Sequence, residues 1–424
     1  MRTRLKVRSA GTFVLAGALL AACSSGGGTT APNSGTAAAG ASTFGVLSCF
    51  TGRLASLGQA MIQGAQVAQK VIDDAGGVNG QPLQLVQGDT GCDVAEGVTA
   101  LTQMLTKGVS GVIGPETQEI NGVEPVLMNN KIVDEFQGGD TSRDHQTDPF
   151  LFRDSPSDSQ LGVAMALYAH KKGYQKAAML FYSDAAAQTI VKPVNDTFVK
   201  LGGTIVTTVT VTPGQTSYLS QVKQVIDSHP DVIFTQTDAP TAAVLFKEFA
   251  QLNGLNIPFV GTDVTGGSDF LKALTYPVAH AHLTSVYGSS VTGQANDGFL
   301  AAFGAMFPAD KAAGPLANAN YAYDAVISLA LAQNYAKSTD GTAVAAAMTK
   351  VTNPPGTACY TYATCLSALK AGTKINYEGA SGSLDYNSYN NTFGPYGAFQ
   401  VDATSGNENQ VMVMNSADLA AATP

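Results

Sequence analysis

Short apolar runs alternate with amphipathic stretches along most of the chain from Ser42 onward. Phe44–Ser48 is an apolar run of strand length, and the stretch Gly58–Ala75 follows it. Apolar residues recur in that stretch at three- and four-residue spacing, which predicts a helix with one buried face. Gly76-Gly77 predicts where this helix ends.

The alternation continues through the middle of the chain. Further strands are predicted at Leu83–Gln87, Val109–Ile113, Lys176–Tyr182, Val232–Thr235 and Phe259–Gly261, and further helices at Thr189–Leu201, Pro240–Leu252 and Tyr321–Tyr335. Strands that alternate with helices form parallel sheets with helices on both faces, so the fold class is α/β with doubly wound parallel sheets. After Gly372 the segments are short and rich in Gly, Asn, Tyr and Ser, which predicts an antiparallel meander near the C-terminus.

The N-terminus has the pattern of an export signal. Four basic residues within residues 1–8 precede an apolar stretch over residues 10–22, which is shorter than the ~20 residues that span a bilayer. Leu20-Ala21-Ala22-Cys23 resembles a bacterial lipobox, so we expect residues 1–22 to be a lipoprotein signal peptide and Cys23 to be lipidated. A plain signal peptide with an incidental cysteine is the alternative. Residues 23–41, rich in Ser, Gly, Thr, Ala and Pro, are expected to form a flexible tether.

Charge and composition exclude several classes of protein. The 424 residues include only 13% charged residues and carry a net charge of −9, which argues against a nucleic-acid binder. Without residues 1–22 the chain keeps 19 basic and 32 acidic residues, a net charge of −13. No later apolar run has spanning length, so we expect an exported domain anchored by lipid at the outer face of the cell membrane, not a permease.

Export permits disulfides, and four cysteines remain once Cys23 is lipidated. Cys49 and Cys92 follow two predicted strands joined by one helix, which favours a Cys49–Cys92 pair, and Cys359 and Cys365 are close together in a Tyr- and Thr-rich loop. We therefore expect the pairs 49–92 and 359–365, although three pairings are possible. Metal binding is the rival interpretation, but no cysteine has a C-x-x-C partner.

Several loops, in order, resemble one known family. They are Phe50–Gly58, Asp73–Gly80, Asp89–Asp93, Gly111–Pro115, Phe152–Asp158, Pro230–Phe234 and Gly261–Asp263. This ordered set resembles the branched-chain amino-acid-type solute-binding proteins of ABC importers, which have the type I periplasmic-binding-protein fold. The resemblance covers nearly all of residues 42–413. It implies a binding protein rather than an enzyme.

The resemblance also implies a domain organisation and partners. The chain would cross three times between a first domain, residues 42–153 plus 284–370, and a second domain, residues 154–283 plus 371–424. Three crossings make a hinge, and the domains would close around a small-molecule ligand. The expected partners are the ligand and ABC permease subunits, with the membrane reached only through the lipid anchor. A monomer without cofactor is expected.

The candidate ligand-binding residues follow predicted strands, because ligands of open α/β sheets bind at the carboxyl ends of strands. In the first domain they are Thr117 and Gln118, in a loop with Glu116 whose backbone N–H groups suit a carboxylate, and Gly139 and Asp140 after the next strand. In the second domain they are Asp184, Asp238 and Asp263. Helix capping or a turn is the alternative role for each aspartate.

The resemblance assigns Asp263 a specific role, because family members place an acidic residue there against the ligand ammonium. Other positions depart from the family. Glu116, Thr117 and Gln118 replace a Ser-rich loop, Ala187 and Gln188 replace a tyrosine, and Arg53 replaces a proline. Branched-chain amino acids are therefore one candidate ligand among other amino acids, amides and small aromatic acids.

Other chemistry has little support in the sequence. His280-Ala281-His282 would place two imidazoles on one strand face, but no acid or cysteine is close by, so no metal site is expected. Tyr287 could stack on a ligand or belong to the core. The leading function is solute capture for an ABC importer. A sensory binding protein of the same fold that signals to a receptor is the alternative, and an exported enzyme is disfavoured because no nucleophile–base pair is apparent.

Overall fold

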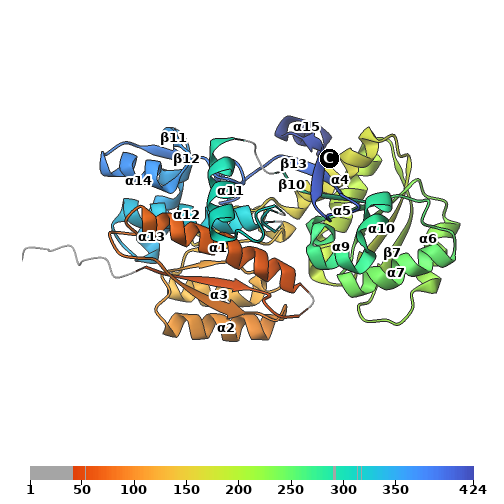
Figure 1. Ribbon diagram of the computed structural model, residues 1–424, viewed down its shortest axis with the longest axis horizontal. Helices are drawn as coiled ribbons and strands as arrows, with labels where there is room; N and C mark the ends of the chain where they lie inside the picture. Colours follow the sequence, from red (N-terminus) through yellow and green to blue (C-terminus); the bar gives the residue numbers. More distant parts are fainter. Residues whose placement is uncertain (1–41, 53, 290–292, 313, 317) are drawn as a thin grey trace, which may run out of the picture. The chain divides into compact units, whose positions relative to one another are not determined.

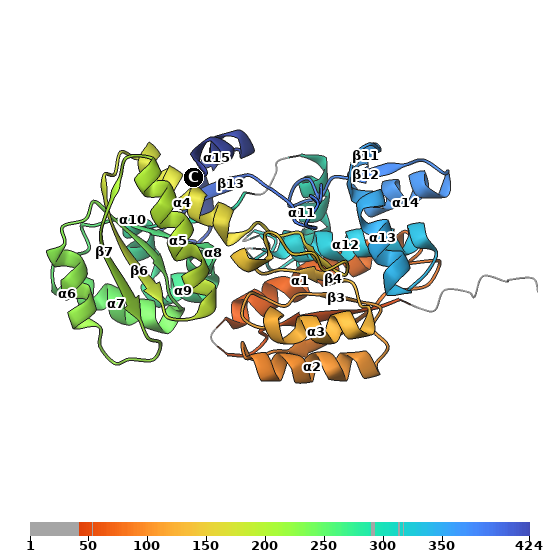
Figure 2. The same ribbon diagram turned by 180° about the vertical axis from the view of Figure 1, so that it is seen from behind.

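The computed structural model describes residues 42–424 except 53, 290–292, 313 and 317. The expected signal peptide, Cys23 and the tether lie outside the described residues. The described chain forms two large sheets, each covered by helices (Figure 1, Figure 2). We call the elements packed on the five-stranded sheet the first lobe and those packed on the seven-stranded sheet the second lobe.

The sheet of the first lobe is parallel, with the strand order β2-β1-β3-β4-β5. Its strands are β1 (Thr43–Ser48), β2 (Gln84–Asp89), β3 (Gly111–Ile113), β4 (Asp134–Phe136) and β5 (Leu151–Arg153). The interior strands β1, β3 and β4 are almost continuously buried, as expected for strands covered on both faces. The strand order reverses between β1 and β3, and such a switch point opens a crevice at the carboxyl ends of the two strands.

Helices cover both faces of this sheet. One face carries α1 (Ala55–Asp74) and α12 (Ala319–Ala336), and the other carries α2 (Val94–Thr106) and α3 (Ile120–Asn130) (Figure 1). Helices α1 and α12 approach closely because α1 has a glycine at the crossing. A Cβ atom on Gly64 would lie 2.0 Å from the carbonyl oxygen of Ala319.

A smaller group of elements completes the first lobe. It comprises α11 (Gln294–Met306), α13 (Gly341–Thr352), α14 (Tyr362–Lys370), the strands β11 (Thr357–Cys359) and β12 (Ile375–Tyr377), and the short 3-10 turn η1 (Thr141–Arg143). Tyr377 and Tyr386 are buried in the same core as α12. The Tyr386 hydroxyl donates a hydrogen bond of 2.7 Å to Glu135 of β4. This bond connects the segment around Tyr386 to the sheet of the first lobe.

The sheet of the second lobe has the order β14-β13-β10-β9-β8-β6-β7. Its strands are β6 (Lys176–Tyr182), β7 (Thr204–Val211), β8 (Val232–Gln236), β9 (Phe259–Gly261), β10 (Leu283–Gly288), β13 (Tyr396–Val401) and β14 (Glu408–Met414). The first five are parallel, and β13 and β14 add the expected antiparallel pair at one edge. A second switch point lies between β6 and β8.

Helices also cover both faces of the second sheet, as the two views show (Figure 1, Figure 2). The helices are α4 (Asp158–Lys171), α5 (Ala185–Lys200), α6 (Leu219–Asp227), α7 (Ala239–Gln251), α8 (Asp263–Gly266), α9 (Ser268–Leu274), α10 (Tyr276–His282) and α15 (Ser416–Ala422). In the part of the chain that is described, no helix is long and apolar enough to cross a membrane.

The chain passes between the lobes after β5, after β10 and before β13. The first and third passages lie side by side, since the Arg153 N–H donates to Asn390 and the Thr392 N–H donates to Arg153. The packing differs from the expected borders in two places. Strand β10, expected to open the second part of the first domain at residue 284, pairs in the second sheet, and residues 375–386 pack in the first lobe.

Two local expectations are wrong. His280 and His282 lie in helix α10 rather than on a strand, because Pro277 at the first turn starts a helix there. The described residues contain no group of three or more His, Cys, Asp or Glu that could hold a metal. The segment around Cys359 and Cys365 is not a loop, because Cys359 ends β11 and Cys365 lies in α14.

Both expected disulfides are present. Cys49 pairs with Cys92 at a Cα–Cα distance of 5.0 Å, and Cys359 pairs with Cys365 at 5.4 Å. The first bond joins the segments that follow β1 and β2, which are adjacent parallel strands. It therefore fixes one side of the first switch point.

The two disulfides should differ in their contribution to stability, because they close loops of 43 and 6 residues. From loop-closure entropy, replacing Cys49 and Cys92 by Ser should lower the free energy of unfolding by about 4 kcal/mol, and replacing Cys359 and Cys365 by about 2 kcal/mol. Urea unfolding of the two double variants measures this difference. An equal loss, or a larger loss for the 359–365 pair, would show that loop entropy does not control their effect.

Candidate ligand-binding site

A cavity of about 130 Å³ is lined by the carboxyl ends of strands from both sheets. Its volume is similar to the ~150 Å³ cavity that holds benzene in an engineered protein, so it suits a small molecule. Both switch points supply residues to it, Cys49 and Glu116 after β1 and β3, and Asp184 and Asp238 after β6 and β8. The position of the cavity therefore follows from the strand order of the two sheets.

Most of the residues expected to bind ligand line this cavity. They are Thr117, Gln118, Gly139, Asp184, Asp238 and Asp263. Asp140 does not line it. Its carboxylate instead caps the turn η1, where it accepts a hydrogen bond of 2.9 Å from the Ser142 N–H.

Asp184 and Asp238 cap helices, which is the alternative role that the sequence left open, and both also line the cavity. Asp184 caps α5 by accepting from the Ala187 N–H at 2.9 Å, and Asp238 caps α7 by accepting from the Thr241 N–H at 2.9 Å. The first turn of each helix directs its backbone N–H groups and the positive end of its dipole toward these carboxylates. Both side chains are thus held in place at the cavity wall by the helices that they begin.

Asp263 begins the short helix α8 directly after β9. Its Oδ2 atom accepts a hydrogen bond of 3.0 Å from the Asn318 side chain, so a contact joins the second lobe to the segment that precedes α12. Burial raises the pKa of Asp263, while the hydrogen bond from Asn318 acts in the opposite direction. A positively charged partner would stabilise the ionised form of this carboxyl group.

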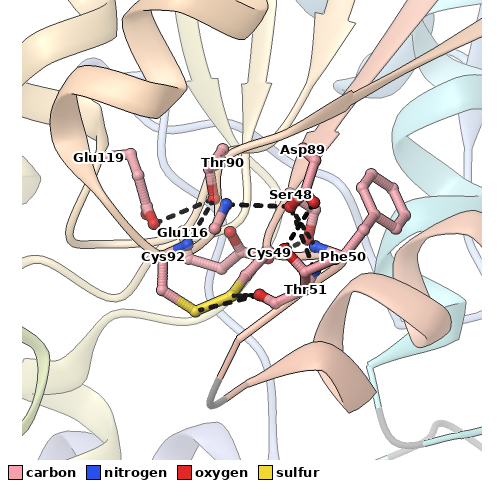
Figure 3. Close-up of a disulfide and its surroundings, with 10 residues drawn as sticks. Ser48, Cys49, Phe50, Thr51, Asp89, Thr90, Cys92, Glu116 and Glu119 are labelled. Atoms are coloured by element: carbon pink, nitrogen blue, oxygen red, sulfur yellow. Dashed lines mark hydrogen bonds between the residues drawn. A yellow bond between two sulfur atoms is a disulfide. The ribbon is translucent and has the colours of Figure 1, made fainter.

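Glu116 and Glu119 form a pair of acids at the first switch point. Glu116 accepts a hydrogen bond from the Ser48 hydroxyl, and Glu119 accepts one of 3.2 Å from Thr90 (Figure 3). Burial, together with the charge of Glu119, raises the pKa of Glu116 to about 8. The loop that the sequence assigned to a ligand carboxylate therefore contains two carboxyl groups of the protein itself.

Asp158 is a further cavity acid that the sequence analysis did not select. It lies in the first turn of α4 and accepts a hydrogen bond from the Thr189 hydroxyl. Burial raises its pKa to about 7, and the Asp263 charge adds to this increase. Gly139 faces it so closely that a Cβ atom there would lie 2.0 Å from Asp158 Oδ1, so only glycine fits this position without rearrangement.

Four tyrosines contribute aromatic rings to the cavity wall: Tyr182, Tyr287, Tyr321 and Tyr396. Tyr287 is both a core and a cavity residue. Its ring stacks on Phe399 with centroids 4.0 Å apart, and its hydroxyl donates to Glu408 at 2.6 Å. Tyr396 is fixed by a hydrogen bond of 3.1 Å from its hydroxyl to the Ser157 carbonyl oxygen.

One side of the cavity is apolar. Leu54, Leu57 and Met61 at the start of α1 lie on this side, and the Cys49–Cys92 disulfide also lines the cavity. The sequence analysis did not select these residues, because their spacing in α1 is that of an ordinary buried helix face. They can contact an aliphatic portion of a ligand.

Carboxyl groups are prominent among the described residues that line the cavity. Within the described residues, the lining contains six carboxyl groups and no Lys, Arg or His side chain. The acids are Glu116, Glu119, Asp158, Asp184, Asp238 and Asp263.

The raised pKa of Glu116 predicts how stability depends on pH. From about pH 4.5, where the unfolded carboxyl loses its proton, to about pH 8, where the folded one does, the folded protein holds an extra proton. The free energy of unfolding therefore falls as pH rises in this window, by up to ~1.4 kcal/mol per pH unit for this group. Glu116→Gln resembles the protonated form and should make the decline less steep.

Urea unfolding of the ligand-free protein at several pH values between 5 and 8 measures this slope. Glu96→Gln is the matched control, since Glu96 is exposed and lies outside the cavity. It should keep the slope of the unmodified protein. A slope that Glu116→Gln leaves unchanged would contradict the raised pKa.

Comparison with known proteins gives a consistent result. A sequence profile described as periplasmic binding protein matches residues 42–361. The chain is 26% identical over 315 residues to the Leu/Ile/Val-binding protein homolog 1 of Brucella abortus (strain 2308), an alignment that covers 70% of this chain and 79% of the relative.

Solved structures share the fold at low sequence identity. The leucine binding protein LivK of Thermotoga maritima MSB8 superposes with a TM-score of 0.75 at 19% identity, covering 89% of this chain and 99% of that protein. The branched-chain amino acid transporter substrate binding protein LivJ of Streptococcus pneumoniae, in complex with isoleucine, has a TM-score of 0.74 at 21% identity, covering 89% and 100%. A solute binding protein of an ABC transporter from R. palustris, in complex with benzoate, has a TM-score of 0.70 at 18% identity, covering 89% and 97%.

Proposed function

Because the chain belongs to the periplasmic binding protein family, we propose that it captures a small molecule in the cavity and delivers it to an ABC importer. The relatives and solved structures that it resembles are solute-binding proteins rather than enzymes. The observation that carries this proposal is the position of the cavity. Residues from the switch points of both sheets line it, so one ligand can contact both lobes at once.

A ligand that contacts both lobes can change the position of one lobe relative to the other. A ligand shifts a protein toward the state that it binds better, and it binds best where both walls touch it. The three passages between the lobes, which follow β5, follow β10 and precede β13, are the proposed hinge. On this basis the first lobe comprises about residues 42–153 plus 294–391, and the second about residues 154–288 plus 392–424.

We assign ligand binding to the polar groups of the cavity wall. Thr117, Gln118 and Gly139 belong to the first lobe, and Asp184, Asp238 and Asp263 to the second. The fold alone does not select the ligand, since structures that share it were solved with isoleucine and with benzoate.

Binding of a small molecule is testable without knowledge of the ligand. The protein from residue 42 onward should be screened by thermal shift against amino acids, amides, amines and aromatic acids. A ligand at ~100 times its Kd stabilises the folded state by ~2.7 kcal/mol and so raises Tm measurably. A hit should also make the protein more compact in small-angle X-ray scattering. If no compound from any of these classes changes Tm, the solute-binding proposal fails.

Membrane attachment is a separate part of the proposal and rests on Cys23, its preceding Leu20-Ala21-Ala22 and the following Ser- and Gly-rich segment. The full chain expressed in a bacterium should appear in the membrane fraction and resist a salt wash, because acyl chains and not charges hold it there.

Cys23→Ser should move most of the protein to the soluble exported fraction, whereas Ser25→Ala, two residues away, should leave it on the membrane. Immunoblots of salt-washed fractions give the distribution. A Cys23→Ser protein that remains with washed membranes would exclude lipidation at this position.

A further inference from the structure

The Cys49–Cys92 disulfide belongs to the wall of the cavity. Its two halves differ in exposure, because Cys49 is only 1% exposed and Cys92 is partly exposed. We propose that this bond is a redox-sensitive site: an extracytoplasmic dithiol protein reduces it, and the reduced protein binds its solute more weakly. This inference rests on the proposed solute-binding function and adds a means of regulating it.

Cys49 connects the disulfide to two other parts of the cavity wall. Its neighbour Ser48 donates a hydrogen bond to Glu116, in the loop before α3 (Figure 3). The Cys49 backbone also packs directly against α1, since a Cβ atom on Gly58 would lie 2.5 Å from the Cys49 carbonyl oxygen. A shift of Cys49 would therefore displace both the Glu116 loop and the start of α1, which line the cavity.

The backbone at Cys92 has a conformation that the disulfide helps to maintain. Gly91 and Cys92 have φ angles of 56° and 61°, in the left-handed region that residues with a side chain rarely adopt. A residue persists in such a conformation where its surroundings hold it there. The bond to Cys49 is one of these restraints, so its reduction leaves the loop after β2 freer to relax.

Hydrogen bonds hold the same two loops together independently of the disulfide. The Asp89 carboxylate accepts bonds of 3.0 and 3.2 Å from the N–H groups of Phe50 and Thr51, which follow β1. It also accepts one of 2.9 Å from the Gly91 N–H, which follows β2. The loops thus stay associated after reduction, and we expect a local change in the cavity wall rather than unfolding of the lobe.

The exposure of the two cysteines defines the order of the exchange reaction. A thiolate of the dithiol attacks the sulfur of Cys92, forms a mixed disulfide with it and releases Cys49 as a thiolate, which takes up a proton. The second thiol of the reductant then attacks the reductant sulfur of the mixed disulfide, and Cys92 leaves as a thiol. Two electrons pass from the dithiol to the cysteines, and the reductant ends as a disulfide.

Solute binding and reduction should oppose each other, because the bond belongs to the cavity wall. Coupling between two sites is reciprocal, so a solute that binds the oxidised form more tightly stabilises that form by the same factor. A filled cavity therefore retains the disulfide, and an empty one loses it more readily.

Reduction can be followed in a protein that has this single disulfide. From residue 42 onward, the double variant Cys359→Ser/Cys365→Ser keeps only the cysteines 49 and 92. Dithiothreitol should reduce their bond without unfolding the protein, as checked by alkylation with mass spectrometry and by circular dichroism. Hydrogen exchange should then become faster in residues 54–62 and 114–120 and stay unchanged in residues 176–200 of the second lobe. A bond that resists dithiothreitol, or exchange that does not increase in these two segments, would overturn the inference.

Calorimetry measures the effect on binding. The first probes are isoleucine and benzoate, which are bound in structures of this fold. If neither binds, the compound that raises Tm most in the thermal-shift screen replaces them. Reduction should weaken binding of the probe by about 5-fold or more. The control variant Cys49→Ser/Cys92→Ser should bind as weakly as the reduced protein, with or without dithiothreitol.

Equal affinity before and after reduction would overturn the inference and leave the solute-binding proposal intact. Failure of every compound in the screen would remove both. The rate of reduction by dithiothreitol gives a second test, since a saturating concentration of the bound probe should slow it. The same rate with and without the probe would contradict the coupling between solute and disulfide.

Discussion

The structure brings several carboxyl groups together at the wall of one cavity. Burial disfavours the ionised form of a carboxyl group, so the loops that carry these acids must hold them with protons or with hydrogen-bond donors. Burial accordingly raises the pKa of Glu116 to about 8 and that of Asp158 to about 7.

This arrangement is a consequence of the two sheets. Each has one position where the strand order reverses, and each sends the loops after the two flanking strands into the same cavity. The helices that follow the strands then fix the acids, as α5 and α7 do through Asp184 and Asp238. The Cys49–Cys92 bond restrains the loops after β1 and β2. Helices, strands and a disulfide thus hold the polar groups of the cavity wall in place.

The sequence predicts much of this framework because hydrophobic periodicity is a local property. Strands β6 and β9 have the predicted bounds, and the ends of β8 and β9 correctly place Asp238 and Asp263 at the cavity. Long-range packing determines what the sequence analysis missed. Tyr396 and Asp158 belong to segments more than 200 residues apart that meet only in the folded chain, and each alone has the pattern of a buried or capping residue. Asp140 lies at a strand end like the other candidates, but its carboxylate turns back to cap η1.

The central claim is that one small molecule in the cavity contacts both lobes and draws them together. Small-angle X-ray scattering of the protein from residue 42 onward, with and without a saturating compound from the thermal-shift screen, measures this change. The account predicts a smaller radius of gyration when the compound is bound, because the ligand favours the state in which both walls touch it. A radius of gyration that stays the same at saturation would contradict it.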